Sequence, residues 1–240
     1  IEATKSDVAA GFRSFSRGMA EPVAALVERL AGKVRFAQGV AGLVPLKRGW
    51  HVAVTGGSAH DVDAVVLALP AWAAGRLLEA VGAGHARQLA ETPYLPSITV
   101  SLAYRDSQLS GPLQGAGFVV ETPEHIRACT FASLKFPNRA PHGSVLLRAY
   151  LPPQDGDPGQ VAHGQLTRIL GIRGEPLWSR VFYWNRGLPR YRPHHAEHVD
   201  AIRKRLRRLP PIAIAGAGYD GAGVSACVRS GRRAATELVA

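Results

Sequence analysis

The sequence predicts a mixed α/β (α+β) fold in which a layered α/β domain carries an inserted, mostly antiparallel sheet. Three observations predict this fold. The apolar run at 62–70 is typical of a strand buried on both faces of a parallel sheet. The stretch at 93–191 contains short strand-like segments separated by Pro and Gly turns. An apolar strand, a glycine-rich turn and a helix then follow at 212–239.

These observations divide the chain into three consecutive parts. Residues 1–72 are expected to form a helix and the later strands of the layered domain. Residues 73–192 are expected to form the inserted domain, mostly antiparallel sheet with helices. Residues 193–240 return to the first domain and supply its final strand, turn and helix. A chain of 240 residues is long enough to bury a sizeable core in this arrangement.

The first part is expected to open with an amphipathic helix. Residues 18–31 place apolar side chains at helical spacing, with Pro22 suited to the first turn and Gly32 to the end. A strand that includes Val40 follows, and Pro70 ends the apolar run and begins a helix. The other elements expected before residue 82 are strands at 34–37 and 50–55 and the helix at 71–81.

The inserted part alternates strands and turns, and it is followed by a basic helix. Period-two patterns and turn residues predict strands at 97–104, 117–121, 128–133, 144–151 and 180–184. A helix is expected at 161–170 within this part, and the basic helix at 193–208. The chain then reaches the apolar strand at residue 212.

Composition indicates a soluble globular protein, with 46% hydrophobic and 20% charged residues. Two cysteines cannot form a disulfide framework, which favours a reducing cytoplasm. No apolar run reaches the roughly 18 residues that a membrane-spanning helix needs. The chain opens with Ile1 and its single methionine is Met19, so we expect it to be part of a longer polypeptide.

The net charge of +11 allows a nucleic acid, an anionic membrane surface or a small polyanion as partner. The densest basic run, at 203–208, lacks the aromatic stacking platform of single-strand binders, so no nucleic acid is expected. Peripheral contact with the inner face of a membrane stays open. His194, His195 and His198 have a spacing that could bind a metal on a helix, but cysteine ligands are lacking nearby and no metal site is expected.

The glycine-rich turn matches a dinucleotide-binding pattern. Gly216, Gly218 and Gly221 satisfy G-x-G-x-x-G between a strand and a helix, where glycines let backbone amides approach a pyrophosphate. A complete unit of this kind needs a second strand and an acidic residue about 20 positions further on. The sequence stops at Ala240 and Glu237 lies inside the helix, so a tight strand-to-helix turn is an equal interpretation of the spacing alone.

Seven groups of residues, taken in chain order, carry a resemblance to a known family. They are Phe15–Met19, Val40-x-x-Leu43, Ala64–Pro70, Thr130–Ser133 with Phe136–Pro141, Leu146–Arg148, Tyr183-Trp184 with Leu188-Pro189-x-Tyr191, and Gly216–Val224 with Cys227. This ordered set resembles the C-terminal half of the FAD-dependent protoporphyrinogen and coproporphyrinogen oxidases, within the flavin amine oxidase superfamily. The resemblance covers nearly the whole chain.

The resemblance implies that the layered domain is part of an FAD/NAD(P)-binding, Rossmann-like domain. The G-x-G-x-x-G unit of the family would lie in an N-terminal half before Ile1, and the final turn would be a second FAD contact. The residues that match the FAD contacts of the family are Val40, Trp184, Ala217, Ala222, Gly223 and Val224. Without the resemblance, the same residues would be interpreted as ordinary core or interface residues. No residue is predicted to be catalytic, because the cofactor carries the chemistry.

The resemblance also implies an activity in haem biosynthesis. The expected reaction oxidises coproporphyrinogen III to coproporphyrin III, or protoporphyrinogen IX to protoporphyrin IX, by hydride transfer to the flavin. Dioxygen would be the final acceptor and hydrogen peroxide the second product. Since coproporphyrinogen carries four propionates, Lys135 and Arg148 are hypothesised to hold or steer it.

Two other interpretations of the chain are kept. A flavin amine oxidase or a phytoene-desaturase-like oxidoreductase would share the fold, and the signatures at Phe136-Pro137 and Leu188-Pro189-x-Tyr191 favour the porphyrinogen oxidases over them. A non-catalytic, truncated binding module is the alternative from another class. It follows from the expectation that FAD binding needs the N-terminal half of the same polypeptide.

Overall fold

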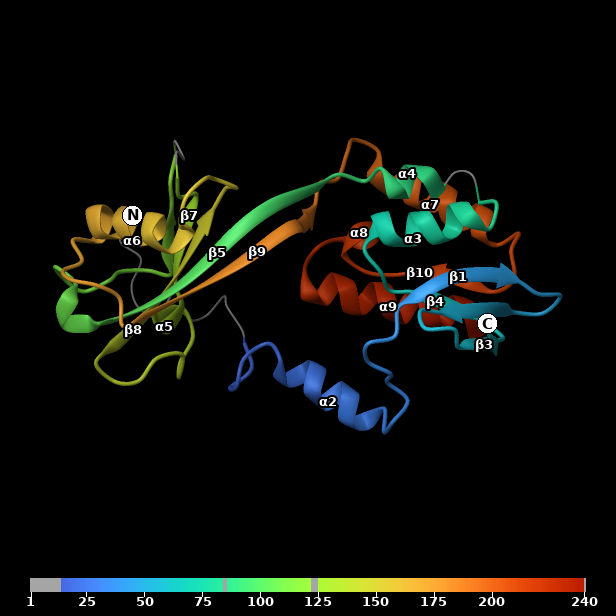
Figure 1. The fold of residues 1–240 in the computed structure, drawn as a ribbon, viewed down its shortest axis with the longest axis horizontal. Helices are drawn as coiled ribbons and strands as arrows, with labels where there is room; N and C mark the ends of the chain where they lie inside the picture. Colours follow the sequence, from blue (N-terminus) through green and yellow to red (C-terminus); the bar gives the residue numbers. More distant parts are fainter. Residues whose placement is uncertain (1–13, 84–85, 122–124, 240) are drawn as a thin grey trace. The chain divides into compact units, whose positions relative to one another are not determined.

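The computed structural model describes residues 14–83, 86–121 and 125–239. The chain forms two compact units (Figure 1). The five-stranded unit contains the residues up to 34 and residues 96–187. The α/β unit contains residues 35–95 and 188–240.

In the α/β unit, an antiparallel sheet has the order β1 (Val40–Pro45), β2 (Trp50–Val54) and β3 (Ala59–Val62). A separate parallel pair joins β4 (Val65–Leu67) to β10 (Ile212–Ile214), with Ile212 opposite Val65. The strand expected at 62–70 is therefore wrong as a single strand. The chain changes partner between Val62, which lies opposite Trp50, and Val65.

The expected strand at 34–37 is also wrong, because β1 begins only at Val40. Ala37 has a φ of 55°, a left-handed conformation that interrupts extended backbone. The two sheets are tied together at Trp50, which is fully buried. Its indole Nε1 donates to the carbonyl of Pro211 at 3.1 Å, just before β10.

The helices of the α/β unit are α3 (Ala71–Ala80), α4 (Arg87–Ala90), α7 (His195–Leu206), α8 (Ala217–Asp220) and α9 (Val224–Val239). The first four bury apolar side chains in one core, and α9 packs Ala234 into a smaller cluster with Ala213 and Ala215. Leu78 of α3 and Val199 of α7 belong to the same buried cluster as Trp50. The one-turn helix α8 occupies the glycine-rich stretch, where the sequence predicted only a turn.

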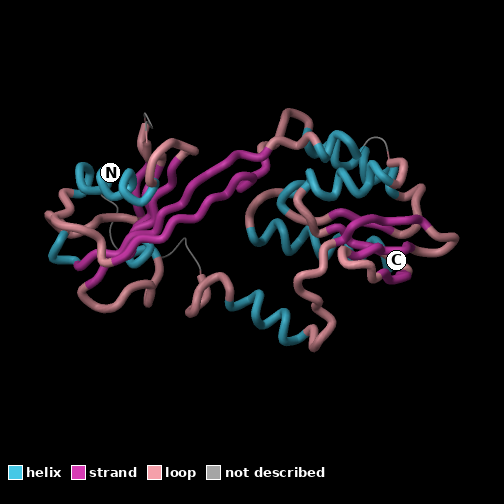
Figure 2. The backbone as a smooth tube through the Cα atoms, in the orientation of Figure 1, coloured by secondary structure: helices cyan, strands magenta, loops and turns pink. Residues whose placement is uncertain are grey.

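The five-stranded unit has the strand order β6 (Gly117–Val119), β7 (Ala128–Phe131), β8 (Ser144–Leu151), β5 (Tyr94–Arg105) and β9 (Trp178–Pro189). The long strands β5 and β9 lie side by side (Figure 2). Helix α6 (Pro158–Leu170) begins at Asp157, whose carboxylate accepts from Gly159 N at 2.7 Å. Leu166 of α6 packs into the core of the sheet. The remaining elements of this unit are α2 (Glu21–Arg29), the 3₁₀ turn η2 (Asp106–Gln108) and α5 (Ala132–Lys135).

The mixed α/β fold class and the antiparallel sheet between two segments of an α/β unit are confirmed. The compact units end at other residues than the expected parts did. The chain crosses between units after residues 34, 95 and 187, so that α2 belongs to the five-stranded unit and α3 to the α/β unit. The last two crossings fall inside β5 and β9, so no loop-like stretch of sequence marks them. The roles of the expected parts stay predictions.

Candidate functional site

The glycines of the turn after β10 have different physical roles. Gly216 and Gly221 lie on either side of α8 and have φ of 119° and 121°. Residues that carry a side chain rarely adopt this backbone conformation. Gly218 is instead required for packing, since a Cβ there would lie 2.9 Å from both Ala71 Cβ and Tyr94 Oη. The interpretation of Gly218 as a residue that opens the backbone to a ligand is therefore wrong. Gly223 is exposed, and a Cβ there would meet open space.

Helix α9 begins directly after this open position. The first N–H groups of a helix have no acceptor inside it and carry a partial positive charge. In α9, Cys227 N bonds the carbonyl of Gly223 at 3.0 Å, and the residues from Ala222 to Ser225 are exposed. Val224 and Val228, which are 63% and 56% exposed, place apolar side chains beside these amides. The turn can therefore hold an anionic group next to an apolar one.

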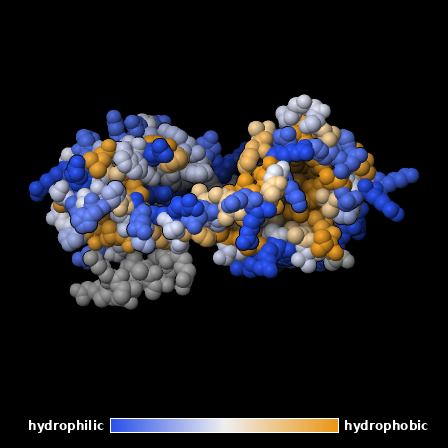
Figure 3. Space-filling model, turned by 90° about the horizontal axis from the view of Figure 1, so that it is seen from below, coloured by the Kyte–Doolittle hydropathy of each residue, from blue (hydrophilic) through white to orange (hydrophobic). Residues whose placement is uncertain are grey.

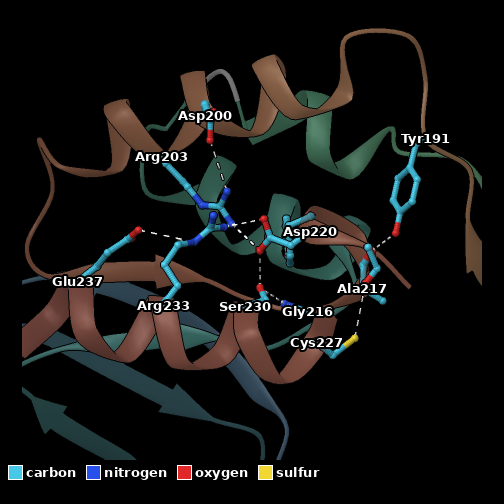
Figure 4. A network of polar contacts seen from close by, with 12 residues as sticks. Tyr191, Asp200, Arg203, Gly216, Ala217, Asp220, Cys227, Ser230, Arg233 and Glu237 are labelled. Carbon is cyan, nitrogen blue, oxygen red and sulfur yellow. Dashed lines mark hydrogen bonds and ion pairs between the residues drawn. The ribbon is translucent and has the colours of Figure 1, made fainter. Parts of the chain in front are cut away.

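A partly buried carboxylate fixes the backbone of the turn (Figure 4). Asp220, the last residue of α8, accepts hydrogen bonds from Arg203 Nη2 at 2.8 Å, from Arg233 Nη2 at 2.6 Å and from the hydroxyl of Ser230. Ser230 Oγ in turn accepts from Gly216 N at 2.9 Å. Burial works to raise the pKa of Asp220, but the three hydrogen bonds together hold it below its usual value. The carboxylate thus stays ionised and ties α7, α8 and α9 together.

Three tyrosines hold the backbone around α8. The Tyr191 hydroxyl donates to the carbonyl of Ala217 at 2.6 Å, as Figure 4 shows. Tyr219, which is buried, donates to the carbonyl of Leu69 at 3.0 Å. The hydroxyl of Tyr94 accepts from the first amide of α3. Tyr191 therefore holds the start of α8 from outside, and Tyr219 ties α8 itself to the segment that leads into α3.

The predicted site residues fall into three places. Ala217, Ala222, Gly223 and Val224 lie on the single stretch of α8, turn and α9. Val40 is the first residue of β1 in the same unit and is 42% exposed. Trp184 lies on β9 in the five-stranded unit, where its Nε1 donates to Thr99 Oγ1 at 3.1 Å. Exposed apolar surface is visible on the α/β unit in Figure 3.

Sequence reasoning missed the residues that support the turn. Asp220 lay in a motif but received no role, and Tyr191 was a family signpost only. Ser230 and Arg233 are three residues apart on α9, a spacing that could have indicated a shared partner. Arg203 carried no such signal, because it lies 17 residues before Asp220 and within a basic run that looked solvated.

The hypothesised substrate cations lie in the five-stranded unit. Arg148 is exposed on β8. Lys135 closes α5, with Nζ 5.7 Å from the centroid of the Phe136 ring. Among the described residues, no group of three His, Cys, Asp or Glu side chains could hold a metal ion. In the same residues, no helix is long and apolar enough to cross a membrane.

Comparison with known proteins places the chain. The profile of the flavin containing amine oxidoreductases matches residues 3–239. The chain belongs to this family. It is 29% identical to the coproporphyrinogen III oxidase of Propionibacterium freudenreichii over 246 residues, which cover 98% of this chain and 46% of that protein. It is 30% identical to the coproporphyrinogen III oxidase of Mycobacterium tuberculosis over 210 residues, or 82% and 45% of the two chains.

A solved structure is also similar to this chain over about half of its own length. The chain superposes with a TM-score of 0.80 and 26% identity on a protein from Exiguobacterium sp. 255-15 that is assigned as a protoporphyrinogen oxidase. The match covers 95% of this chain and 52% of that one. The chain therefore spans about half the length of the relatives it matches.

The turn fits the flavin cofactor of this family. A flavin dinucleotide combines an anionic pyrophosphate with an apolar ring system. The open position at Gly223, the first amides of α9 and the exposed Val224 and Val228 provide a donor group and an apolar group side by side. Within the part of the chain that the structure describes, this turn offers such a combination of groups.

Proposed function

We propose that the polypeptide carrying this chain is an FAD-dependent porphyrinogen oxidase of haem biosynthesis. The proposed substrates are coproporphyrinogen III, which gives coproporphyrin III, or protoporphyrinogen IX, which gives protoporphyrin IX. Dioxygen is the proposed electron acceptor and hydrogen peroxide the second product. The observation that carries the proposal is the open first turn of α9, held in place by Asp220 in a member of a flavin family. The names of the relatives support the substrate class.

Each predicted contact has a proposed role. Ala217, Ala222, Gly223 and Val224 line the FAD at the closing turn, and the backbone of Val40 contacts its adenine end. When bound, the flavin supplies a site that accepts a hydride from carbon. The first amides of α9 offset part of the pyrophosphate charge, because their N–H groups point out of the helix end.

The five-stranded unit is the proposed substrate unit. Trp184 is proposed to lie near the flavin and to orient it, supported by its bond to Thr99. Phe182 and Tyr183, its exposed neighbours on β9, offer apolar surface for a macrocycle. Arg148 and Lys135 are proposed to hold the propionates by charge-assisted hydrogen bonds.

The remaining proposals concern the surroundings of the enzyme. An N-terminal half of the same polypeptide would supply the G-x-G-x-x-G unit and complete the FAD site. A cytoplasmic location is proposed, with peripheral contact to the inner membrane face through the basic residues of α7. Binding of nucleic acid is not part of the proposal.

Flavin absorbance of the purified, intact polypeptide tests the function. We expect yellow protein whose flavin absorbance bleaches anaerobically with coproporphyrinogen III or protoporphyrinogen IX and returns with dioxygen. The ratio of the two bleaching rates decides between the substrates. Bleaching by a primary amine and by neither porphyrinogen would favour the amine oxidase alternative. Colourless protein that retains RNA or DNA at moderate salt would contradict the proposal.

A further inference from the structure

The α/β unit contains a cavity of about 400 Å³ that the proposed flavin contacts do not use. It lies between α4, the residues leading into β5, and the segment from the end of β9 into α7. The N–H of Arg190 bonds the carbonyl of Pro93 at 2.8 Å and fixes the two connecting segments to each other. The volume lies within the roughly 300–1,000 Å³ of small-molecule pockets.

The lining of this cavity is apolar at its base. Leu89, Val199 and Ile202 line it and are no more than 3% exposed themselves. They belong to the core cluster of the unit, so the base is part of the rigid interior. The small exposed part of these side chains therefore offers a ligand a narrow, preformed apolar contact.

The rim of the cavity carries an excess of positive charge. Arg190 and Arg192 line it, and neither forms an ion pair with a carboxylate of the described residues. The acidic residue at the rim, Glu91, is already paired with Arg87 at 3.1 Å. A guanidinium group holds a carboxylate or phosphate through two parallel hydrogen bonds. The rim therefore favours an anion.

One wall of the cavity is also a contact of the flavin turn. His195 lines the cavity, and its ring packs against that of Tyr191 with centroids 4.6 Å apart. The hydroxyl of Tyr191 donates to the carbonyl of Ala217 at 2.6 Å. His195 Nε2 is buried and forms no hydrogen bond of normal geometry with the described residues, although the backbone carbonyls of Gly218 and Tyr219 lie close enough to act on the imidazole. A ligand that moves the imidazole would thus act on the Ala217 carbonyl through a single intervening ring.

We propose that this cavity binds a small amphiphilic organic anion and passes its occupancy through His195 and Tyr191 to the turn at Ala217. The acid group lies on Arg190 and Arg192, and the apolar body on Leu89 and Ile202. The binding step depends on the cavity alone. The coupling step rests on the proposed function, since it makes the ligand an effector of the flavin site. The acid group is a carboxylate or a phosphate.

Calorimetry on the intact polypeptide tests the binding step. The probes share one ring system: 1-naphthoate, 1-naphthyl phosphate and the neutral 1-naphthalenemethanol. We expect saturable binding of one anion per chain, with the alcohol weaker by about tenfold or more, or about 1.4 kcal/mol. The tighter of the two anions identifies the acid group. Equal binding of the alcohol, or no binding of either anion, would overturn the proposal.

A matched pair of double variants separates the effect of the two rim arginines from the effect of net charge. Arg190→Gln with Arg192→Gln should weaken binding of the anion by about tenfold or more. Lys47→Gln with Arg48→Gln removes the same charge from the turn between β1 and β2, outside the cavity, and should leave the affinity unchanged. An equal loss in both double variants would show a long-range charge effect and would contradict a built site.

The coupling step has its own readout. The bound anion should perturb the flavin absorbance of the wild type and leave it unperturbed in Tyr191→Phe, which keeps the ring contact with His195 and loses the bond to Ala217. The same perturbation in both proteins would overturn the coupling. A protein without flavin would overturn the proposed function, and the calorimetric result would still decide whether the cavity binds the anion.

Discussion

Arg203 on α7 and Asp220 at the end of α8 form an ion pair with 2.8 Å between Nη2 and Oδ2. Their side chains are only 12% and 19% exposed. A pair so far removed from water is stable only if the rest of the carboxylate is also hydrogen-bonded. Arg233 and Ser230 fulfil this condition, and Ser230 passes the contact on to Gly216 N. The pair therefore fixes the backbone at the start of the candidate flavin turn.

Asp220→Asn should destabilise the fold. The substitution leaves Arg203 mostly buried, with Asp200 at 3.5 Å as its remaining ionised partner among the described residues. We expect a loss of about 2–3 kcal/mol in the free energy of unfolding, at the low end for a broken buried pair. Urea unfolding of the intact polypeptide measures it. The control, Glu91→Gln, breaks an exposed pair and should cost about 0.5 kcal/mol or less. Equal losses would show that the network contributes little.

Gly218→Ala should destabilise the fold for a steric reason. The added methyl would meet Ala71 Cβ and Tyr94 Oη at 2.9 Å and force α8 away from α3. Overpacking of this kind costs about 1–3 kcal/mol. Gly231→Ala on α9 is the matched control, since a methyl there meets open space and raises helix propensity by about 0.5–1 kcal/mol. The midpoint temperature of thermal unfolding should therefore fall in Gly218→Ala and rise in Gly231→Ala. A shift of both variants in the same direction would contradict the packing role of Gly218.

Much of the fold could be predicted because its signals are local. The strand at 144–151 agrees with β8 at both ends, since its alternating pattern matches a sheet with one buried face. The helix at 71–81 agrees with α3 within one residue, because Pro70 marks its start. The run at 62–70 misled the prediction. Its apolar residues serve an antiparallel and a parallel sheet in turn, and a hydrophobic pattern cannot reveal a change of partner.

The candidate site was predictable only in part for the same reason. The glycines around α8 could be found, but their roles depend on contacts from distant residues. Gly218 faces Tyr94, which lies 124 positions earlier, and Asp220 meets Arg203 through tertiary packing. The FAD contacts at Val40 and Trp184 rest on the family resemblance and stay predictions.

Acid should weaken the fold through His195. Burial, together with the nearby His198, lowers the pKa of this imidazole, and the Gly218 and Tyr219 carbonyls and Asp220 oppose this effect only in part. The unfolded chain then binds more protons than the folded one below the usual histidine pKa of about 6.5. Stability should fall as the pH drops from about 7 to 5.5. His195→Phe keeps the ring against Tyr191 and should flatten this slope in urea unfolding, and an unchanged slope would contradict the assignment.

Gly223→Ala should weaken flavin binding by more than it weakens the fold. A methyl at this position meets no protein atom within 4 Å, and the loss of stability should be about 0.5–1 kcal/mol, because alanine is a poorer N-cap than glycine. The methyl would instead occupy the open side of the turn, where the first amides of α9 are proposed to approach the pyrophosphate. We expect the affinity for flavin to fall by about tenfold or more. The fluorescence of the flavin that is released during dialysis measures this loss. Gly231→Ala, on the same helix but away from its start, should retain flavin like the wild type. Flavin held equally tightly by both variants would show that the cofactor does not approach this turn.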